Sequence, residues 1–277
     1  MHPLQTAIER LASLGEVERD PEAREIFLRF RDELTQGRIR AAEKVGGHWV
    51  ANTWVKQGIL LGFRLGELRE IKAGDTLAFV DKDTFPARQF TPRDRVRLVP
   101  GGSSVREGAY VAQSVICMPP MFINAGAYVD EGTLVDSHAL VGSCAQIGKR
   151  VHLSAASQVG GVLEPINAVP VVIEDDVLVG GNCGVYEGTL VRARAVLGAG
   201  TILTRSTPLY DVVRGEVYRA REDRPLEVPQ NAVVVPGARA IQQGKGAEWN
   251  LSLYTPVIVK YRDEKTDRGI ELEDYLR

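Results

Sequence analysis

Two aspartates and two histidines near the middle of this 277-residue chain could carry acid–base chemistry. Asp130 and Asp136 occur in the segment Tyr-Val-Asp-Glu-Gly-Thr-Leu-Val-Asp-Ser-His, which ends at His138, and His152 follows later. Histidine suits proton transfer near neutral pH, and a carboxylate can accept the proton of an attacking amine. The alternative for each aspartate is a corner residue that accepts backbone N–H groups. The alternative for His138 is a surface or interface residue.

A metal site is disfavoured by the small number of histidines. A catalytic zinc site of this kind uses three histidines, and His2 and His48 lie far from the other two in the sequence. Cys117, Cys144 and Cys183 show no C-x-x-C spacing, which favours reduced, buried thiols over a catalytic thiol. We therefore predict no metal, and a cytoplasmic protein.

The candidate residues must be positioned by a repeat of six residues. One aliphatic residue, once a cysteine, returns at every sixth position, and a small or β-branched residue usually stands four further on. This period fits neither an amphipathic helix at 3.6 nor a simple strand at 2. It is typical of a parallel β-helix, in which each hexad forms a short strand and a corner. The repeated positions are Val105, Val111, Cys117, Ile123, Val129, Val135, Val141, Ile147, Leu153 and Val159.

The repeat is interrupted twice. An excursion at 165–172 shifts its phase by two residues and must bulge outward, and one at 210–226 has the composition of a charged hairpin. Hexads resume after each excursion, so the repeat continues well beyond Val159. We predict three domains, namely an N-terminal α/β domain at 1–104, the β-helix at 105–239 and a C-terminal extension at 240–277.

The N-terminal domain is predicted to be small and rich in helix. Apolar residues at helical spacing predict one helix that ends at Gly15 and a second one between Pro21 and Gly37. A third helix is predicted to begin at Asn52 or Thr53. The remaining elements are a predicted hairpin at 39–50 around Gly46-Gly47, and loops with short strands at 68–104.

The C-terminal extension is predicted to contain a Gly/Gln-rich loop at 240–250, a strand at 251–261 and a short polar helix at the end. The ends of a solenoid must be covered, and the two flanking domains are candidates for these caps.

The composition argues against a nucleic-acid partner, a membrane span and a signal peptide. Lys and Arg number 34 against 36 for Asp and Glu, which leaves a net charge of −2 and argues against a nucleic-acid partner. No run of about 18 apolar residues occurs, so we predict no membrane span. The N-terminus also lacks the apolar core of a signal peptide.

The repeat alone leaves the function open among acyl transfer from an acyl-CoA, metal-dependent hydration of carbon dioxide, and a structural scaffold. Glycines offer a further signal, because they let a ligand approach the backbone closely. Gly160-Gly161 and Gly198-Ala199-Gly200 could bind the pantetheine arm of CoA, and the alternative is tight corner geometry.

Distinctive segments extend over nearly the whole chain. They are Glu43-Lys-Val-Gly-Gly-His-Trp-Val50, Gly126-Ala-Tyr-Val-Asp-Glu-Gly-Thr133, Val141-Gly-Ser-Cys-Ala-Gln-Ile-Gly-Lys149, Val151-His-Leu-Ser154, Gly160-Gly-Val-Leu-Glu-Pro165, Ile173-Glu-Asp175, Ser252-Leu-Tyr254 and Val257-Ile-Val-Lys260. Together they resemble the family of 2,3,4,5-tetrahydropyridine-2,6-dicarboxylate N-succinyltransferases, hexapeptide-repeat acyltransferases of the diaminopimelate route to lysine.

The resemblance implies a left-handed parallel β-helix and a homotrimer with sites between its subunits. It implies succinyl-CoA as co-substrate, tetrahydrodipicolinate as acceptor and no tightly bound cofactor. The acceptor is a cyclic imine that hydrates and opens, and its exposed amine attacks the thioester. Use of acetyl-CoA on the same or a similar amine is the alternative, and a non-enzymatic scaffold is a third.

The resemblance also assigns residues. Arg97 matches the substrate-binding arginine, whose guanidinium can hold a carboxylate bidentately. Asp136 matches the family's aspartate and is expected to contact and deprotonate the amine. Lys260 joins the predicted CoA-binding residues through the matching C-terminal segment.

Two positions depart from the family pattern. Other members have tryptophan in place of His138, and a second active-site glutamate in place of Gly184. Either Glu187 takes over the role of that glutamate, or Asp136 acts alone, with or without help from His138.

Overall fold

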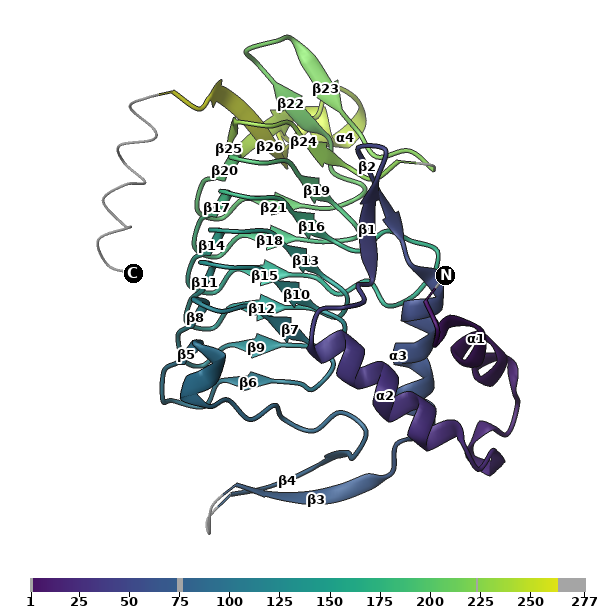
Figure 1. Ribbon diagram of the computed structural model, residues 1–277. Helices are drawn as coiled ribbons and strands as arrows, with labels where there is room; N and C mark the ends of the chain where they lie inside the picture. The colour runs from purple at the N-terminus through teal and green to yellow at the C-terminus, as the bar shows by residue number, and fades with distance from the viewer. Residues whose placement is uncertain (1, 74–76, 223, 264–277) are drawn as a thin grey trace.

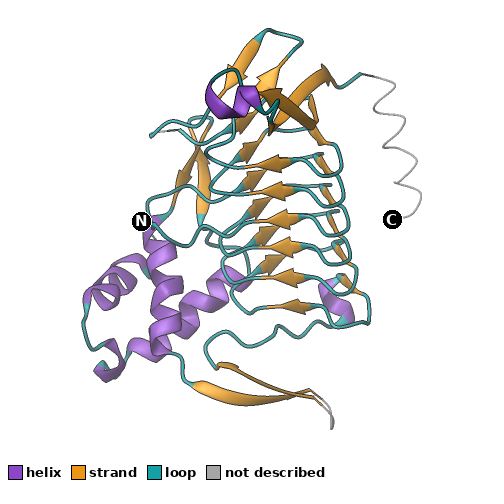
Figure 2. Cartoon of the chain, turned by 180° about the vertical axis from the view of Figure 1, so that it is seen from behind, coloured by secondary structure: helices purple, strands orange, loops and turns teal. Residues whose placement is uncertain are grey.

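The computed structural model describes residues 2–73, 77–222 and 224–263. A group of helices near the N-terminus lies against one side of a tall coil of short strands (Figures 1 and 2). The N-terminal elements are α1 (Gln5–Ser13), η1 (Val17–Arg19), α2 (Ala23–Thr35), β1 (Ala42–Val45), β2 (His48–Ala51), α3 (Thr53–Leu65), β3 (Leu68–Ala73), β4 (Leu77–Lys82) and η2 (Pro92–Asp94).

The coil has three flat sides, each formed by a sheet of parallel strands. Sheet 1 begins with β5 (Arg97–Leu98), β8 (Ile116–Cys117), β11 (Leu134–Val135), β14 (His152–Leu153), β17 (Leu178–Val179) and β20 (Val196–Leu197). Sheet 2 comprises β6 (Ser104–Val105), β9 (Phe122–Ile123), β12 (Leu140–Val141), β15 (Gln158–Val159), β18 (Gly184–Val185) and β21 (Ile202–Leu203). Sheet 3 comprises β7 (Tyr110–Val111), β10 (Tyr128–Val129), β13 (Gln146–Ile147), β16 (Val172–Ile173), β19 (Leu190–Val191) and β24 (Glu227–Val228).

Sheet 1 also contains the strands that close the upper end of the coil. A long antiparallel pair formed by β25 and β26 follows β20, and a short hairpin of β22 and β23 lies beyond it. The bounds of these strands are β22 (Leu209–Asp211), β23 (Glu216–Tyr218), β25 (Ala232–Ala240) and β26 (Ser252–Tyr261). The predicted charged hairpin and the predicted C-terminal strand are both confirmed.

The hexad explains this architecture. In every two-residue coil strand after β5, the second residue points inward and is buried, as Val129, Val135 and Val141 are, with no exposed surface. In β5, at the end of the coil, Leu98 is half-buried. Backbone N–H groups bond to the neighbouring coil, so the sheets run parallel to the axis of the prism. Repeated burial of aliphatic side chains supplies the stabilising free energy, and the narrow interior leaves little room for aromatic rings. The mainly β fold of parallel hexad strands is confirmed.

We call the three edges of the prism corner 1–2, corner 2–3 and corner 3–1, after the sheets that meet there. The N-terminal helices cover part of corner 2–3. Ile59 of α3 packs so closely on Gly126 that a Cβ at residue 126 would be 2.5 Å from its Cδ1 atom. The β1–β2 hairpin instead lies over sheet 3, toward corner 3–1.

The three predicted N-terminal helices and the hairpin around Gly46-Gly47 are confirmed. Both glycines have positive φ angles, 56° and 85°, as a tight two-residue turn requires. Asn52 occupies the cap position of α3, but its side chain donates to the carbonyl of Arg40 and makes no capping bond.

Three details differ from the expectations. Parallel pairing begins with β5, inside the range assigned to the N-terminal domain, because a seven-residue step from Leu98 to Val105 breaks the hexad phase. The loops and short strands predicted at 68–104 include a longer antiparallel pair, β3 and β4, of six residues each. The predicted loop at 240–250 contains a short helix, α4 (Gly244–Glu248). The predicted C-terminal helix lies outside the described residues, and the three-domain division stays a prediction.

Candidate functional site

Arg97 and Asp136 lie on the same side of the prism. Arg97 begins β5 and is exposed, and Asp136 follows β11 at corner 1–2. Strands β5 and β11 are separated by one strand, β8, which places them roughly 10 Å apart at the usual spacing of neighbouring strands. A small dicarboxylate can therefore contact a cation and a carboxylate on this side.

The carboxylate of Asp136 is held by its own turn. Its Oδ1 atom accepts the backbone N–H of Ser137 at 2.7 Å, which leaves Oδ2 without a partner among the described residues. His138 occupies the left-handed position of the same turn, with φ 61°, and is exposed. Asn182 and Gly200 take this position two and three coils higher with φ 55° and 77°. Corner geometry thus accounts for the backbone of His138, and its side chain is free to act at the surface.

A column of small residues rises along corner 1–2 above Asp136. One residue per coil forms this column, and its backbone N–H bonds to the coil above. From bottom to top, Asp136 is followed by Ser154, Gly180 and Gly198. Gly198 and Asp136 are three coils apart, roughly 14 Å at the usual strand spacing. The structure therefore brings the predicted Gly198-Ala199-Gly200 segment onto the corner that carries Asp136. It also adds Gly180, which the sequence analysis missed although it follows the repeated aliphatic by one position, as Gly198 does.

Lys260 lies at the upper end of the same sheet. It is exposed, forms an ion pair with Asp263 at 3.6 Å and pairs in register with Val233, which pairs with Val196 of β20. Lys260 is therefore near Gly198, and its predicted contact with CoA stays a prediction.

Gly160, Gly161 and Glu187 lie on a different edge, corner 2–3. Glu187 is exposed, and its Oε2 atom accepts the backbone N–H of Arg205 at 2.7 Å. Packing explains the glycine pair, because a Cβ at residue 161 would be 2.7 Å from the backbone nitrogen of Ser143. Within one chain, these residues are not brought together with Asp136.

Tyr186 is a residue of this corner that the sequence analysis missed. A Cβ at Gly160 would be 2.8 Å from Cδ1 of the Tyr186 ring, and a Cβ at Gly184 would be 2.9 Å from its hydroxyl oxygen. That hydroxyl has no hydrogen-bond partner among the described residues. The signal in the sequence was an aromatic residue directly after a repeated aliphatic, at a position where other coils have glycine.

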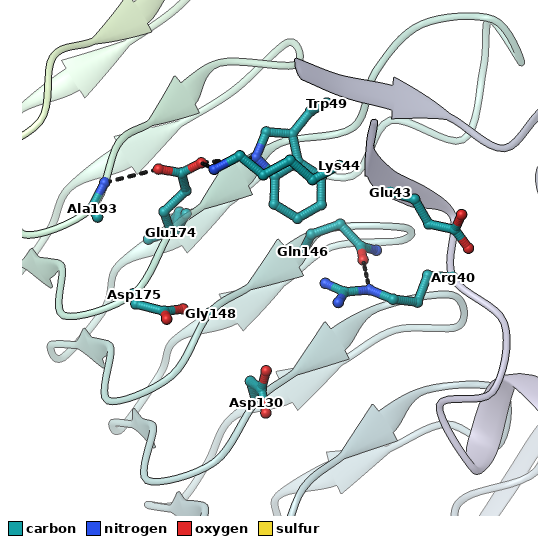
Figure 3. A pocket seen from close by; sticks show the side chains of 11 residues that line it. Arg40, Glu43, Lys44, Trp49, Asp130, Gln146, Gly148, Glu174, Asp175 and Ala193 are labelled. Carbon is teal, nitrogen blue, oxygen red and sulfur yellow. Dashed lines mark hydrogen bonds and ion pairs between the residues drawn. The ribbon is translucent and has the colours of Figure 1, made fainter. Parts of the chain in front are cut away.

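A pocket of about 540 Å³ lies between the β1–β2 hairpin and corner 3–1, away from Asp136 (Figure 3). Local sequence patterns could not predict this pocket, because its residues come from two regions, 40–49 and 130–193, that lie far apart in the chain. The charged side chains that line it are Arg40, Glu43, Lys44, Asp130, Glu174 and Asp175.

The upper part of this pocket is an internally satisfied network around Glu174. Its carboxylate accepts hydrogen bonds from Lys44 Nζ at 2.9 Å, Trp49 Nε1 at 3.0 Å and the backbone N–H of Ala193 at 3.1 Å. Burial acts to raise the pKa of Glu174, but these hydrogen bonds outweigh it and the net pKa is lowered. Glu174 is therefore an anion that holds the hairpin against the coil.

The three cysteines are free and buried, as predicted, and burial raises the pKa of the Cys117 and Cys144 thiols to about 12. Such thiols stay protonated and unreactive near neutral pH. In the described ranges, no group of three or more His, Cys, Asp or Glu side chains is arranged to hold a metal ion. None of the helices described here is long and apolar enough to cross a membrane.

Comparison with known proteins identifies the family. Residues 3–65 match a profile described as the tetrahydrodipicolinate N-succinyltransferase N-terminal region, and residues 170–205 match the hexapeptide repeat of succinyl-transferase. A 2,3,4,5-tetrahydropyridine-2,6-dicarboxylate N-succinyltransferase of Sodalis glossinidius is 39% identical over 280 residues, covering 99% of this chain and 96% of the relative. The chain belongs to this family.

A second tetrahydropyridine-dicarboxylate N-succinyltransferase, from Burkholderia ambifaria, is 41% identical over 278 residues, covering 99% of this chain and 96% of that protein. A crystal structure from Campylobacter jejuni, assigned as a tetrahydropyridine-2-carboxylate N-succinyltransferase, superposes with a TM-score of 0.52 at 14% identity. It covers 84% of this chain and 62% of that one. This structural likeness supports the fold, and the sequence matches establish membership of the N-succinyltransferase family.

Proposed function

We propose that this protein transfers the succinyl group of succinyl-CoA to the amine of ring-opened tetrahydrodipicolinate, which yields N-succinyl-2-amino-6-oxopimelate and CoA. The reaction belongs to lysine biosynthesis by the diaminopimelate succinylase route. The proposal rests on near full-length similarity to N-succinyltransferases. The observation that carries the site is the placement of Arg97 and Asp136 on one side of the prism.

In the proposed mechanism Arg97 holds a carboxylate of the acceptor through its guanidinium group. Asp136 uses its free oxygen to orient the acceptor amine and to accept its proton. The amine nitrogen forms a bond to the thioester carbonyl carbon, the carbon–sulfur bond breaks and CoA leaves as a thiolate. That thiolate then takes up a proton, so the balance requires no oxidant or metal.

The proposed path of the pantetheine arm follows corner 1–2 past Gly180 and Gly198 toward Asp136. Succinyl-CoA is the co-substrate in this proposal, and no tightly bound cofactor is required. Gly198, Ala199, Gly200 and Lys260 would line the upper part of this path. Gly160 and Gly161 would contribute only from another copy of the chain, because they lie on corner 2–3.

The separation of the two corners supports a homotrimer with sites between subunits. A neighbouring copy that brings its corner 2–3 against corner 1–2 would add Tyr186 and Glu187 to the groove that contains Asp136. We also propose a left-handed coil and a cytoplasmic location. Measurement of the solution mass by light scattering tests the trimer, and a monomer that retains full activity would refute shared sites.

The decisive experiment measures CoA release by purified protein with tetrahydrodipicolinate and either succinyl-CoA or acetyl-CoA. We expect turnover with succinyl-CoA and much slower turnover with acetyl-CoA. Faster release with acetyl-CoA would overturn the choice of donor. Absence of turnover with both would favour a scaffold.

A further inference from the structure

The pocket at corner 3–1 contains a guanidinium group that is fixed in place but only partly used. The Cζ atom of Arg40 lies 3.6 Å from the centre of the Tyr128 ring. Its Nε donates to Oε1 of Gln146 at 2.9 Å (Figure 3). Gln146 is itself buried and held by a bond from its Nε2 atom to the carbonyl of Cys144. The position of Arg40 is thus determined from two sides.

Both terminal NH₂ groups of Arg40 have no hydrogen-bond or ion-pair partner among the described residues, whereas Nε is occupied. A planar guanidinium with two free terminal groups matches the geometry of a carboxylate. Because the stacking and the Gln146 bond already fix the side chain, little conformational entropy would be lost when a carboxylate binds.

Two carboxylates with a free oxygen line the same pocket. Oδ1 of Asp130 accepts the backbone N–H of Glu131 at 2.8 Å, and Oδ1 of Asp175 accepts that of Lys149 at 2.9 Å. Neither forms an ion pair with Arg40, and the second oxygen of each has no partner in the described part of the chain. Oxygens of this kind can accept hydrogen bonds from an ammonium group.

The balance of charge determines which ligand fits. Two cationic and four anionic side chains line the pocket, and Arg192 beside it pairs with Glu174 at 3.2 Å, which leaves a formal balance of −1. A dicarboxylate such as the proposed acceptor would be repelled, whereas a ligand with one carboxylate and two ammonium groups would complement the lining. The volume of about 540 Å³ lies in the ordinary range for a small-molecule site.

We propose that this pocket binds a basic amino acid, with its carboxylate on Arg40 and its ammonium groups on Asp130 and Asp175. The site lies on a different corner from Asp136 and takes a ligand of opposite net charge to the acyl acceptor. It is therefore separate from the proposed acyl transfer.

Isothermal titration calorimetry of the full chain tests this site with L-lysine as the probe. L-norleucine lacks the side-chain ammonium group and cadaverine lacks the carboxylate, so each removes one of the proposed contacts. We expect L-lysine to bind at least about tenfold more tightly than either, since each lost contact involves a charged hydrogen bond. Equal binding of the three compounds, or no binding of L-lysine, would overturn the proposal.

The variants Asp175→Asn and Asp130→Asn keep the acceptor for the backbone N–H and remove only the charge. Each is expected to weaken L-lysine binding at least about tenfold. Asp176→Asn is the matched control, because Asp176 pairs with Arg150 and does not line the pocket. Wild-type affinity in both pocket variants would overturn the proposal, and so would an equal loss in the Asp176→Asn control. Arg40→Gln tests the carboxylate contact in the same assay.

Discussion

The ring of Tyr186 occupies the space that a side chain at residue 184 would need. An ideal Cβ on Gly184 would be 2.4 Å from ring atom Cε2 and 2.9 Å from the hydroxyl oxygen. Gly184 is buried in β18, two residues before the tyrosine in the same strand and turn. Tyr186 therefore fills the space beside Gly184, and its hydroxyl oxygen lies close to where a side chain at residue 184 would begin.

Gly184→Ala should destabilise the protein by about 1–3 kcal/mol, the usual cost of inserting a group into a filled site. Tyr186→Val should remove most of this cost, because the ring is what the new Cβ would meet. A double-mutant cycle of unfolding free energies measures the coupling. If Gly184→Ala costs the same in the wild type and in Tyr186→Val, the Tyr186 ring is not the cause of the destabilisation.

Tyr186→Phe tests whether the hydroxyl takes part in the proposed reaction. The variant keeps the ring over Gly184 and removes only the oxygen, so the thermal midpoint should hardly change. If the hydroxyl orients a substrate across the subunit groove, kcat should fall about tenfold, the equivalent of one hydrogen bond. Unchanged kcat would limit Tyr186 to packing.

Asp136→Asn should lower kcat at least about 100-fold, the lower end of the contribution of a general base. Asparagine keeps the acceptor for the Ser137 N–H, so the turn should stay intact. Steady-state CoA release measures the effect, and circular dichroism checks the fold. Asp176→Asn serves as the matched control, and wild-type turnover of Asp136→Asn would remove this residue from the mechanism.

Arg97→Ala should chiefly raise the KM for the acceptor, by at least about tenfold, because a charged hydrogen bond to a carboxylate is lost. The KM for succinyl-CoA should change little. Arg93→Ala, an exposed arginine of η2 just before β5, is the control. An unchanged acceptor KM in Arg97→Ala would count against its role in substrate binding.

Lys56→Met should loosen the excursion between β15 and β16. The fully buried Nζ atom donates to the carbonyls of Pro165 and Ala168 at 2.8 and 2.9 Å. Loss of both bonds leaves the Ala168 carbonyl unsatisfied, at a cost of about 1–3 kcal/mol if it stays buried, whereas the Pro165 carbonyl still accepts the backbone N–H of Ala168. Hydrogen exchange at residues 166–169 and the thermal midpoint report the effect. Unchanged exchange would show that other contacts hold this loop.

The cost of Lys56→Met should also depend on pH. Burial lowers the pKa of Lys56 below its ordinary value of 10.5, so the unfolded chain binds this proton more tightly than the native protein. The contribution of Lys56 to the free energy of unfolding is therefore lowest below the shifted pKa, and it rises with pH toward 10.5. The methionine variant lacks this term, and its deficit relative to wild type should grow as the pH is raised. A constant deficit would contradict the shift.

The six-residue period was sufficient to predict the prism, because inward positions must be aliphatic in every coil. The start of the coil could not be predicted, since the step from Leu98 to Val105 departs from that period while the strand pairing continues. Short strands were predicted at 68–104, but not the β3–β4 pair itself. Four of its apolar residues, Leu68, Leu77, Phe79 and Val80, are exposed, so it shows no alternation of buried and exposed positions.

By itself, the sequence determined the repeat, the three N-terminal helices and the family, and it singled out Arg97 and Asp136. Only the tertiary structure decided which corner each residue occupies. Each hexad advances the chain by one side of the prism, and the excursions add residues that change this count. It therefore takes the folded coil to place Asp136 with Gly198 and apart from Glu187. The same coil brings Arg40 to Gln146 across more than 100 residues, a contact that no local pattern encodes.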